Sequence, residues 1–151
     1  MGLGSGKVGH RDLGVAEGGF GSYVKPYKPW FIGRDAYLAQ RDAPPVAVLC
    51  TLTVDDHRSA SGQLRYMLGG EPILSADGTL LLDTKGRPSY VTSAGSGPST
   101  GKHLLMAYLP AEQARPGARL FTEYLGERYP VTVAVAGSTP LFDPGNERIR
   151  S

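Results

Sequence analysis

The chain has 151 residues, of which 40% are hydrophobic, and a formal net charge of +2 at pH 7. This length suits a single domain, and the nearly neutral charge provides no broad field for a polyanion, so we expect no binding to DNA or RNA. Because no run of about 18 apolar residues occurs and the first residues contain no apolar signal core, we expect no membrane span and a cytoplasmic protein.

Turn-forming residues are spread along the whole chain, which contains 21 glycines and 12 prolines. So many of them predict many short elements and hence a mainly β protein. Residues 1–19 are especially rich in glycine, and we expect them to form a flexible or surface-draped arm.

Residues 20–45 are predicted to begin as an extended segment and to end as a helix. Ala36 and Leu38 favour the helix, and Asp35 would place a negative charge in its first turn, where the helix dipole is stabilised by one. The two prolines at residues 44–45 are predicted to end it.

Residues 46–151 are predicted to form an antiparallel barrel of Greek-key or jelly-roll type, so the fold is mainly β with one N-terminal helix. The clearest strand is residues 46–54, which are apolar and rich in β-branched side chains. Residues 63–90 contain shorter apolar runs whose register the sequence does not define. Further strands are predicted at residues 89–94, 103–109, 119–125 and 128–135, the last two joined by a tight hairpin at Gly126 and Glu127.

Two glycine-rich segments, residues 2–7 and 97–103, are near matches to phosphate-binding loops. Both lack the hydroxyl residue that binds magnesium, because Val8 and His103 stand in its place. Neither is set between a predicted strand and a predicted helix. We therefore expect an arm at the first and a mobile loop between strands at the second.

Metal-binding and nucleophilic chemistry find little support in the sequence. His10, His57 and His103 lie far apart, with no second ligand at helical or hairpin spacing, so we expect no metal site. The acidic residues 55–56 beside His57 resemble part of a charge relay, but in a turn such residues are expected to be solvated caps. No serine lies in a nucleophile elbow, and Cys50 is predicted to be a core thiol because its neighbours are apolar.

Aromatic and cationic side chains are mixed in residues 23–34. Such a segment suits a ligand with a flat ring and an anionic tail, because the ring stacks on aromatic faces and the tail pairs with lysine or arginine. Alternatively, Trp30 and Phe31 anchor the start of the helix in the core while Lys25 and Lys28 face water. Composition alone favours this alternative.

Several short motifs occur in one order along the chain. Residues 31–36 read Phe-Ile-Gly-Arg-Asp-Ala, residues 16–28 form a Glu- and Lys-containing approach to them, and further motifs lie at residues 90–93, 107–110, 115–117 and 140–144. In this order they resemble the C-terminal part of the glycine-cleavage T-protein, or aminomethyltransferase, family. Residues 125–130 and the Asp-Pro ending look most similar to the folate domains of dimethylglycine and sarcosine dehydrogenases.

The resemblance implies a C-terminal barrel that closes against two larger domains, which hold tetrahydrofolate in a central channel. The family transfers a one-carbon unit to this cofactor, and its catalytic aspartate lies in the N-terminal domains, so we expect the isolated chain to be inactive. Matching motifs place Glu17, Lys28 and Arg34 at the channel edge, and with the nearby aromatic Trp30 they are the expected cofactor-binding residues. Lys28 would meet the anionic tail of folate, whereas Glu17 could only cap or pair and Arg34 could pair with a carboxylate at the domain junction.

The expected partners are the N-terminal folate-binding domains, or a subunit of the same family that carries them, or a second copy of this chain. The leading hypothesis is a barrel module that lines the folate channel of an aminomethyltransferase-like protein. The alternative is a non-catalytic interaction or dimerisation module derived from that barrel, because an interface without its partner leaves an apolar patch.

Overall fold

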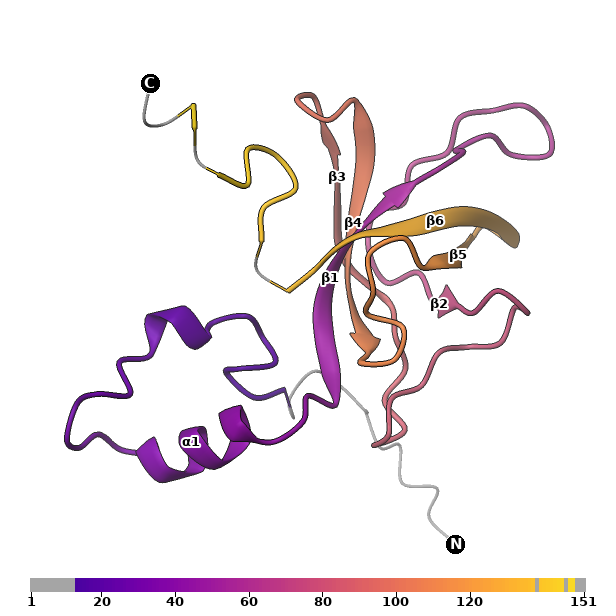
Figure 1. Ribbon diagram of the computed structural model, residues 1–151. Coiled ribbons are helices and arrows are strands. Elements are labelled where there is room, and N and C mark those ends of the chain that lie inside the picture. Colours follow the sequence, from indigo (N-terminus) through magenta and orange to yellow (C-terminus); the bar gives the residue numbers. More distant parts are fainter. Residues whose placement is uncertain (1–12, 138, 146, 149–151) are drawn as a thin grey trace, which may run out of the picture.

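The computed structural model describes residues 13–137, 139–145 and 147–148. It is mainly β, with a short 3₁₀ helix, η2 (Gly21–Tyr23), and one α-helix, α1 (Arg34–Asp42) (Figure 1). No helix in these residues is long and apolar enough to cross a membrane. The strands are β1 (Ala47–Val54), β2 (Ile73–Leu74), β3 (Val91–Gly97), β4 (Lys102–Pro110), β5 (Arg119–Tyr124) and β6 (Glu127–Ala136).

The strands form one antiparallel sheet in the order β2-β5-β6-β1-β4-β3. The sheet curls until its two ends meet, where the backbone N–H of Val91 donates to the carbonyl of Glu71 at 2.8 Å and that of Ile73 donates to Ser89 at 3.0 Å. The predicted fold class, an antiparallel barrel with one N-terminal helix, is therefore confirmed.

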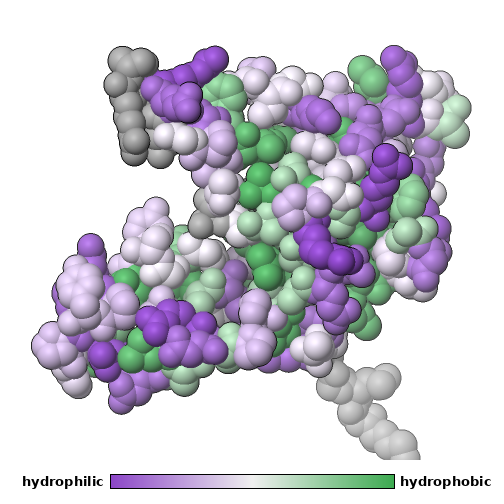
Figure 2. Space-filling model, in the orientation of Figure 1, coloured by the Kyte–Doolittle hydropathy of each residue, from purple (hydrophilic) through white to green (hydrophobic). Residues whose placement is uncertain are grey.

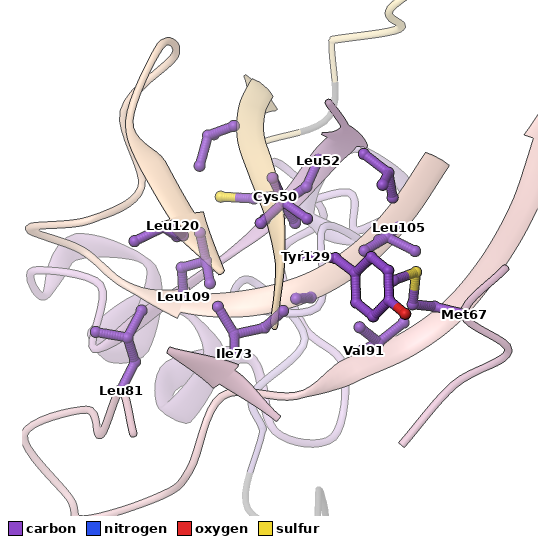
Figure 3. Close-up of a cluster of buried hydrophobic side chains, with 14 residues drawn as sticks. Cys50, Leu52, Met67, Ile73, Leu81, Val91, Leu105, Leu109, Leu120 and Tyr129 are labelled. Carbon is purple, nitrogen blue, oxygen red and sulfur yellow. The ribbon is translucent and has the colours of Figure 1, made fainter. Parts of the chain in front are cut away.

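Alternation along the strands places one set of side chains inside the barrel. In β4 the buried residues His103, Leu105, Ala107 and Leu109 alternate with more exposed ones, as expected for a strand with one face on the core. Figure 3 shows the interior cluster, to which β1, β4, β5 and β6 all contribute. Cys50 lies in it with no exposed surface, and burial raises the pKa of its thiol to about 11, so the predicted core thiol is confirmed.

The predicted hairpin between the last two strands is also confirmed, with a shift of one residue. The turn residues are Leu125 and Gly126, with φ of 52° and 78°, and Glu127 already belongs to β6. Two successive left-handed residues are the signature of a type I′ turn, whose twist matches that of the flanking strands.

The segment between β1 and β3 is a meander in which only β2 is a strand. Of the leucines at residues 80–82, Leu80 and Leu82 form isolated bridges rather than the continuous run of pairing that their apolar character suggests. The same five-residue turn occurs three times in the meander, at Ser59–Gln63, Ser75–Thr79 and Asp83–Arg87. In each, the N–H of the first residue donates to the carbonyl of the fifth, and the carbonyl of the first accepts the N–H of a glycine in the fourth position. Between the second and third turns lie only residues 80–82, so turn chemistry sets the path of the chain there.

The segment of residues 13–46 leaves the barrel as an open loop and returns to it at β1 (Figure 1). Helix α1 begins after Gly33, whose φ is 83°, carries Asp35 in its first turn and ends before residues 44–45, as predicted. None of its nine residues, all of which are described, is buried. The helix therefore contributes nothing to the interior cluster.

Candidate functional site

Arg34 fixes the loop that carries two of the predicted site residues. Its Nε donates to the carbonyl of Lys28 at 3.1 Å and its Nη2 donates to the carbonyl of Pro26 at 3.3 Å, while Nη1 lies 3.5 Å from Asp35 Oδ1. The guanidinium thus ties the loop to the first turn of α1. Arg34 thus contacts a carboxylate within the chain, at the surface, where Asp35 is almost fully exposed, and its pairing with a carboxylate at a domain junction stays a prediction.

Trp30 and Lys28 lie on this loop with their side chains exposed to solvent. Trp30 is 75% exposed, so the alternative in which it anchors the helix in the core is wrong. It belongs to a group of exposed large side chains, which we call the aromatic strip: Phe20, Tyr23, Tyr27, Trp30 and Ile32. These side chains lie within 13 residues of the chain, and exposed apolar side chains that form one patch are typical of binding surfaces.

Glu17 has a different environment from the other predicted site residues. Its side chain is 7% exposed; Oε1 lies 3.3 Å from Arg87 Nη2, and Oε2 accepts the N–H of Gly14 at 3.1 Å. Arg87 in turn contacts Asp83, with 2.6 Å between Nε and Oδ2. Glu17 therefore pairs, one of the two roles expected for it, and fixes the described part of the arm, residues 13–19, to the barrel.

Asp83 is held as a carboxylate by several donors. It accepts the backbone N–H groups of Lys85 and Arg87 as well as the guanidinium of Arg87. Burial alone raises the pKa of a carboxyl, but here these hydrogen bonds outweigh it and keep the pKa of Asp83 below its ordinary value. Its charge is thus available to orient Arg87.

A groove of about 680 Å³ lies between residues 13–20 and the outer face of the sheet; we call it the arm groove. One wall contains Gly14, Gly18 and Phe20, and the sheet supplies Tyr90, Met106 and Tyr108. Burial, and then the negative charge of Glu17, raises the pKa of the Tyr108 phenol, which therefore stays a neutral donor at physiological pH.

A second groove of about 460 Å³ continues along the same face of the sheet. Leu141 and Phe142 of the C-terminal segment form one side of it, and Leu104 and Met106 of β4 form its floor. Met106 lines both grooves. Figure 2 shows the C-terminal segment and the segment of residues 13–45 projecting from the same side of the barrel, with an open recess between them.

The described residues contain no group of three or more histidine, cysteine, aspartate or glutamate side chains that could hold a metal ion. The fold does bring His57 and His103 together, with ring centroids 5.9 Å apart and Tyr66 against both. His103 donates from Nε2 to the carbonyl of Met67 at 3.0 Å, so this ring serves the packing of the meander on β4. His10 lies outside the described residues.

Arg87, Asp83, Tyr90 and Tyr108 are site residues that the sequence analysis missed. The Asp83–Arg87 contact had a local signal, because opposite charges flank a turn marked by Lys85 and glycine. The contact with Glu17 had none, since 70 residues separate the two groups. Tyr90 and Tyr108 are 18 residues apart and share a site only through the folded groove that both line.

Comparison with known proteins places this architecture in a family. Residues 48–143 match the family model of the glycine cleavage T-protein C-terminal barrel domain. The crystal structure of glycine cleavage system aminomethyltransferase T from Bartonella henselae is similar in fold, with a TM-score of 0.56 and 23% sequence identity over 79% of this chain. The match spans 28% of that longer protein. The finer similarity to dimethylglycine and sarcosine dehydrogenases stays a prediction. The chain belongs to the glycine cleavage T-protein family, and it carries the family's C-terminal barrel domain.

Proposed function

We propose that this chain is the barrel module of a tetrahydrofolate-dependent aminomethyltransferase-like protein and that it lines one side of the folate channel. The observation that carries the proposal is the loop of residues 25–30, on which Lys28 and Trp30, two residues apart, are both exposed while Arg34 holds the backbone in place. A loop fixed in this way presents a cation and an aromatic face without further ordering, which favours binding.

The chemistry of the loop suits the cofactor. A folate has flat rings and an anionic glutamate tail, so Trp30 would stack on a ring and the ammonium group of Lys28 would pair with a carboxylate. Arg34 would act mainly by fixing the loop, since two of its nitrogens already donate to backbone carbonyls. Glu17 would act at the channel edge through the arm that it fixes.

The remaining part of the active site would come from N-terminal folate-binding domains, in the same polypeptide or in another subunit. The aromatic strip supports this arrangement, because five large side chains exposed within 13 residues require cover in a working assembly. The match to only 28% of the Bartonella henselae protein is consistent with it. By itself the chain would therefore not transfer one-carbon units.

The test uses the fluorescence of Trp30, which is the one tryptophan in the sequence. The chain is titrated with 5-formyltetrahydrofolate, with N-acetyltryptophanamide as the control for light absorbed by the folate. We expect saturable quenching that Lys28→Ala weakens by about tenfold in Kd and that Lys102→Ala, a lysine at the far end of β4, leaves unchanged. Quenching no greater than that of the free indole would reject the proposal.

The second candidate function is a dimerisation or protein-interaction module, and the 89% exposure of Ile32 favours it. Sedimentation velocity at increasing concentration tests this candidate. Self-association that Ile32→Asp removes, without any response to folate, would support it over the first proposal. A monomer at all concentrations would exclude a dimer formed through the aromatic strip.

A further inference from the structure

A nearly buried group of three charged side chains joins the arm to the barrel. Glu17, Arg87 and Asp83 are 7%, 11% and 4% exposed, and the guanidinium lies between the two carboxylates. We infer that Arg87 is a positioning residue: through it the barrel fixes Glu17 and, with Glu17, the wall of the arm groove that residues 13–20 provide.

Arg87 is oriented by its own turn before it meets the arm. Asp83 accepts the N–H of Arg87 at 3.0 Å and its Nε at 2.6 Å, and it also accepts the N–H of Lys85 at 2.8 Å. Gly86, with φ of 73°, permits the turn that makes these contacts possible. Because a guanidinium donates along fixed directions, holding Nε on Asp83 also sets the direction in which Nη2 points, toward Glu17.

The position of Glu17 determines that of the groove wall. Its Oε2 accepts the N–H of Gly14 at 3.1 Å, and Gly18 donates its N–H to the carbonyl of Gly14 at 2.9 Å. Gly14 and Gly18 both line the arm groove, opposite Tyr90 and Tyr108. The chain of contacts from the barrel to the wall therefore runs from Asp83 through Arg87 and Glu17 to the arm backbone.

This inference deepens the proposed function. It rests on that proposal only for the identity of the ligand or partner that binds in the arm groove. The arm itself is observed by hydrogen exchange in the full chain. We expect Glu17→Gln to accelerate exchange of the Gly18 and Phe20 amides by about tenfold, with exchange in β4 and β6 unchanged within about twofold. Glutamine keeps the bond to Gly14 but removes the charge, and the Asp83–Arg87 contact stays intact, so the barrel is not perturbed.

Arg87→Ala is expected to release the arm as well, and the exposed Arg119 gives the matched control, Arg119→Ala. Arg87→Lys is expected not to restore protection, because a single ammonium group cannot hold both carboxylates in the observed geometry. In the double variant Glu17→Gln/Arg87→Ala the arm amides should exchange only slightly faster than in either single variant, because the two substitutions remove the same interaction.

Two outcomes would overturn the inference: arm amides that stay protected in Glu17→Gln, or effects of the two substitutions that multiply in full. The folate titration separates this question from the proposed function. Suppose the unsubstituted chain does not bind 5-formyltetrahydrofolate, but the variants show the expected faster exchange in the arm. This result would reject the folate channel and keep Arg87 as the residue that positions the arm.

Discussion

The turn between β5 and β6 holds Leu125 in a left-handed backbone conformation that is unfavourable for leucine. Leu125 adopts φ of 52°, and a left-handed residue with a β-carbon costs about 1–2 kcal/mol relative to the right-handed form. Its side chain is 68% exposed, so burial recovers little of this cost. Asparagine reaches the same conformation more easily, and we expect Leu125→Asn to stabilise the protein by about 1 kcal/mol. For a chain of this size, this corresponds to a rise in Tm of about 3 °C.

Urea denaturation and calorimetry measure this effect, and two neighbouring variants serve as controls. Leu125→Ala keeps a β-carbon at the same φ and should change stability by less than about 0.5 kcal/mol. Gly126→Ala should lose about 1 kcal/mol, although an added β-carbon would meet nothing within 4 Å, because its φ is 78°. If Leu125→Asn left the midpoint unchanged at an unaltered m value, the argument from backbone strain would fail.

Three further predictions concern the core and its turns. Leu52 has no exposed surface, so Leu52→Ala should lower the free energy of unfolding by about 2–5 kcal/mol. The control Leu68→Ala, at a site 76% exposed, should change it by less than about 0.5 kcal/mol. Similar urea midpoints for the two variants would contradict the burial of Leu52. Cys50, with its pKa raised to about 11 and no exposure, should not react with a thiol reagent at neutral pH until urea unfolds the chain, and fast labelling of the native protein would refute its burial. Hydrogen bonds from the Ser75 and Thr79 hydroxyls lower the pKa of Asp77 to about 2. The contribution of this carboxylate to stability is therefore complete above its unfolded pKa of about 3.9 and is lost as the pH falls toward 2. Asp77→Asn should make the free energy of unfolding depend less on pH in that window, and curves parallel to those of the unchanged protein would show that these hydrogen bonds contribute nothing.

Much of the barrel could be predicted because its information is local. The apolar run of β1 and the glycine at the β5–β6 turn each fix an element without reference to distant residues. Helix α1 likewise carries Asp35 in its first turn and ends before two prolines, and both local signals are in the sequence.

The meander and the site could not be predicted in the same way. Between residues 57 and 91 the path is set mostly by isolated bridges, by tight turns and by hydrogen bonds that flank those turns, such as that from Ser89 to Leu81, rather than by regular strands. The arm groove depends on the pairing of Glu17 with Arg87, across 70 residues, and no periodicity reports such a contact. Composition favoured a buried Trp30, and this was wrong, because the sequence alone does not distinguish an exposed aromatic residue from one in a core.

The loop of residues 13–46 has a consequence for how the molecule loses its structure. A nine-residue helix that buries no side chain has too few turns to persist by intrinsic propensity, so its tether to Gly21 through the Tyr37 hydroxyl and the Arg34 contacts must supply what the interior does not. We therefore expect this loop to melt at a much lower free energy than the barrel, as a separate cooperative unit. Sequence change can then accumulate in the loop while the pairing of the strands stays as it is.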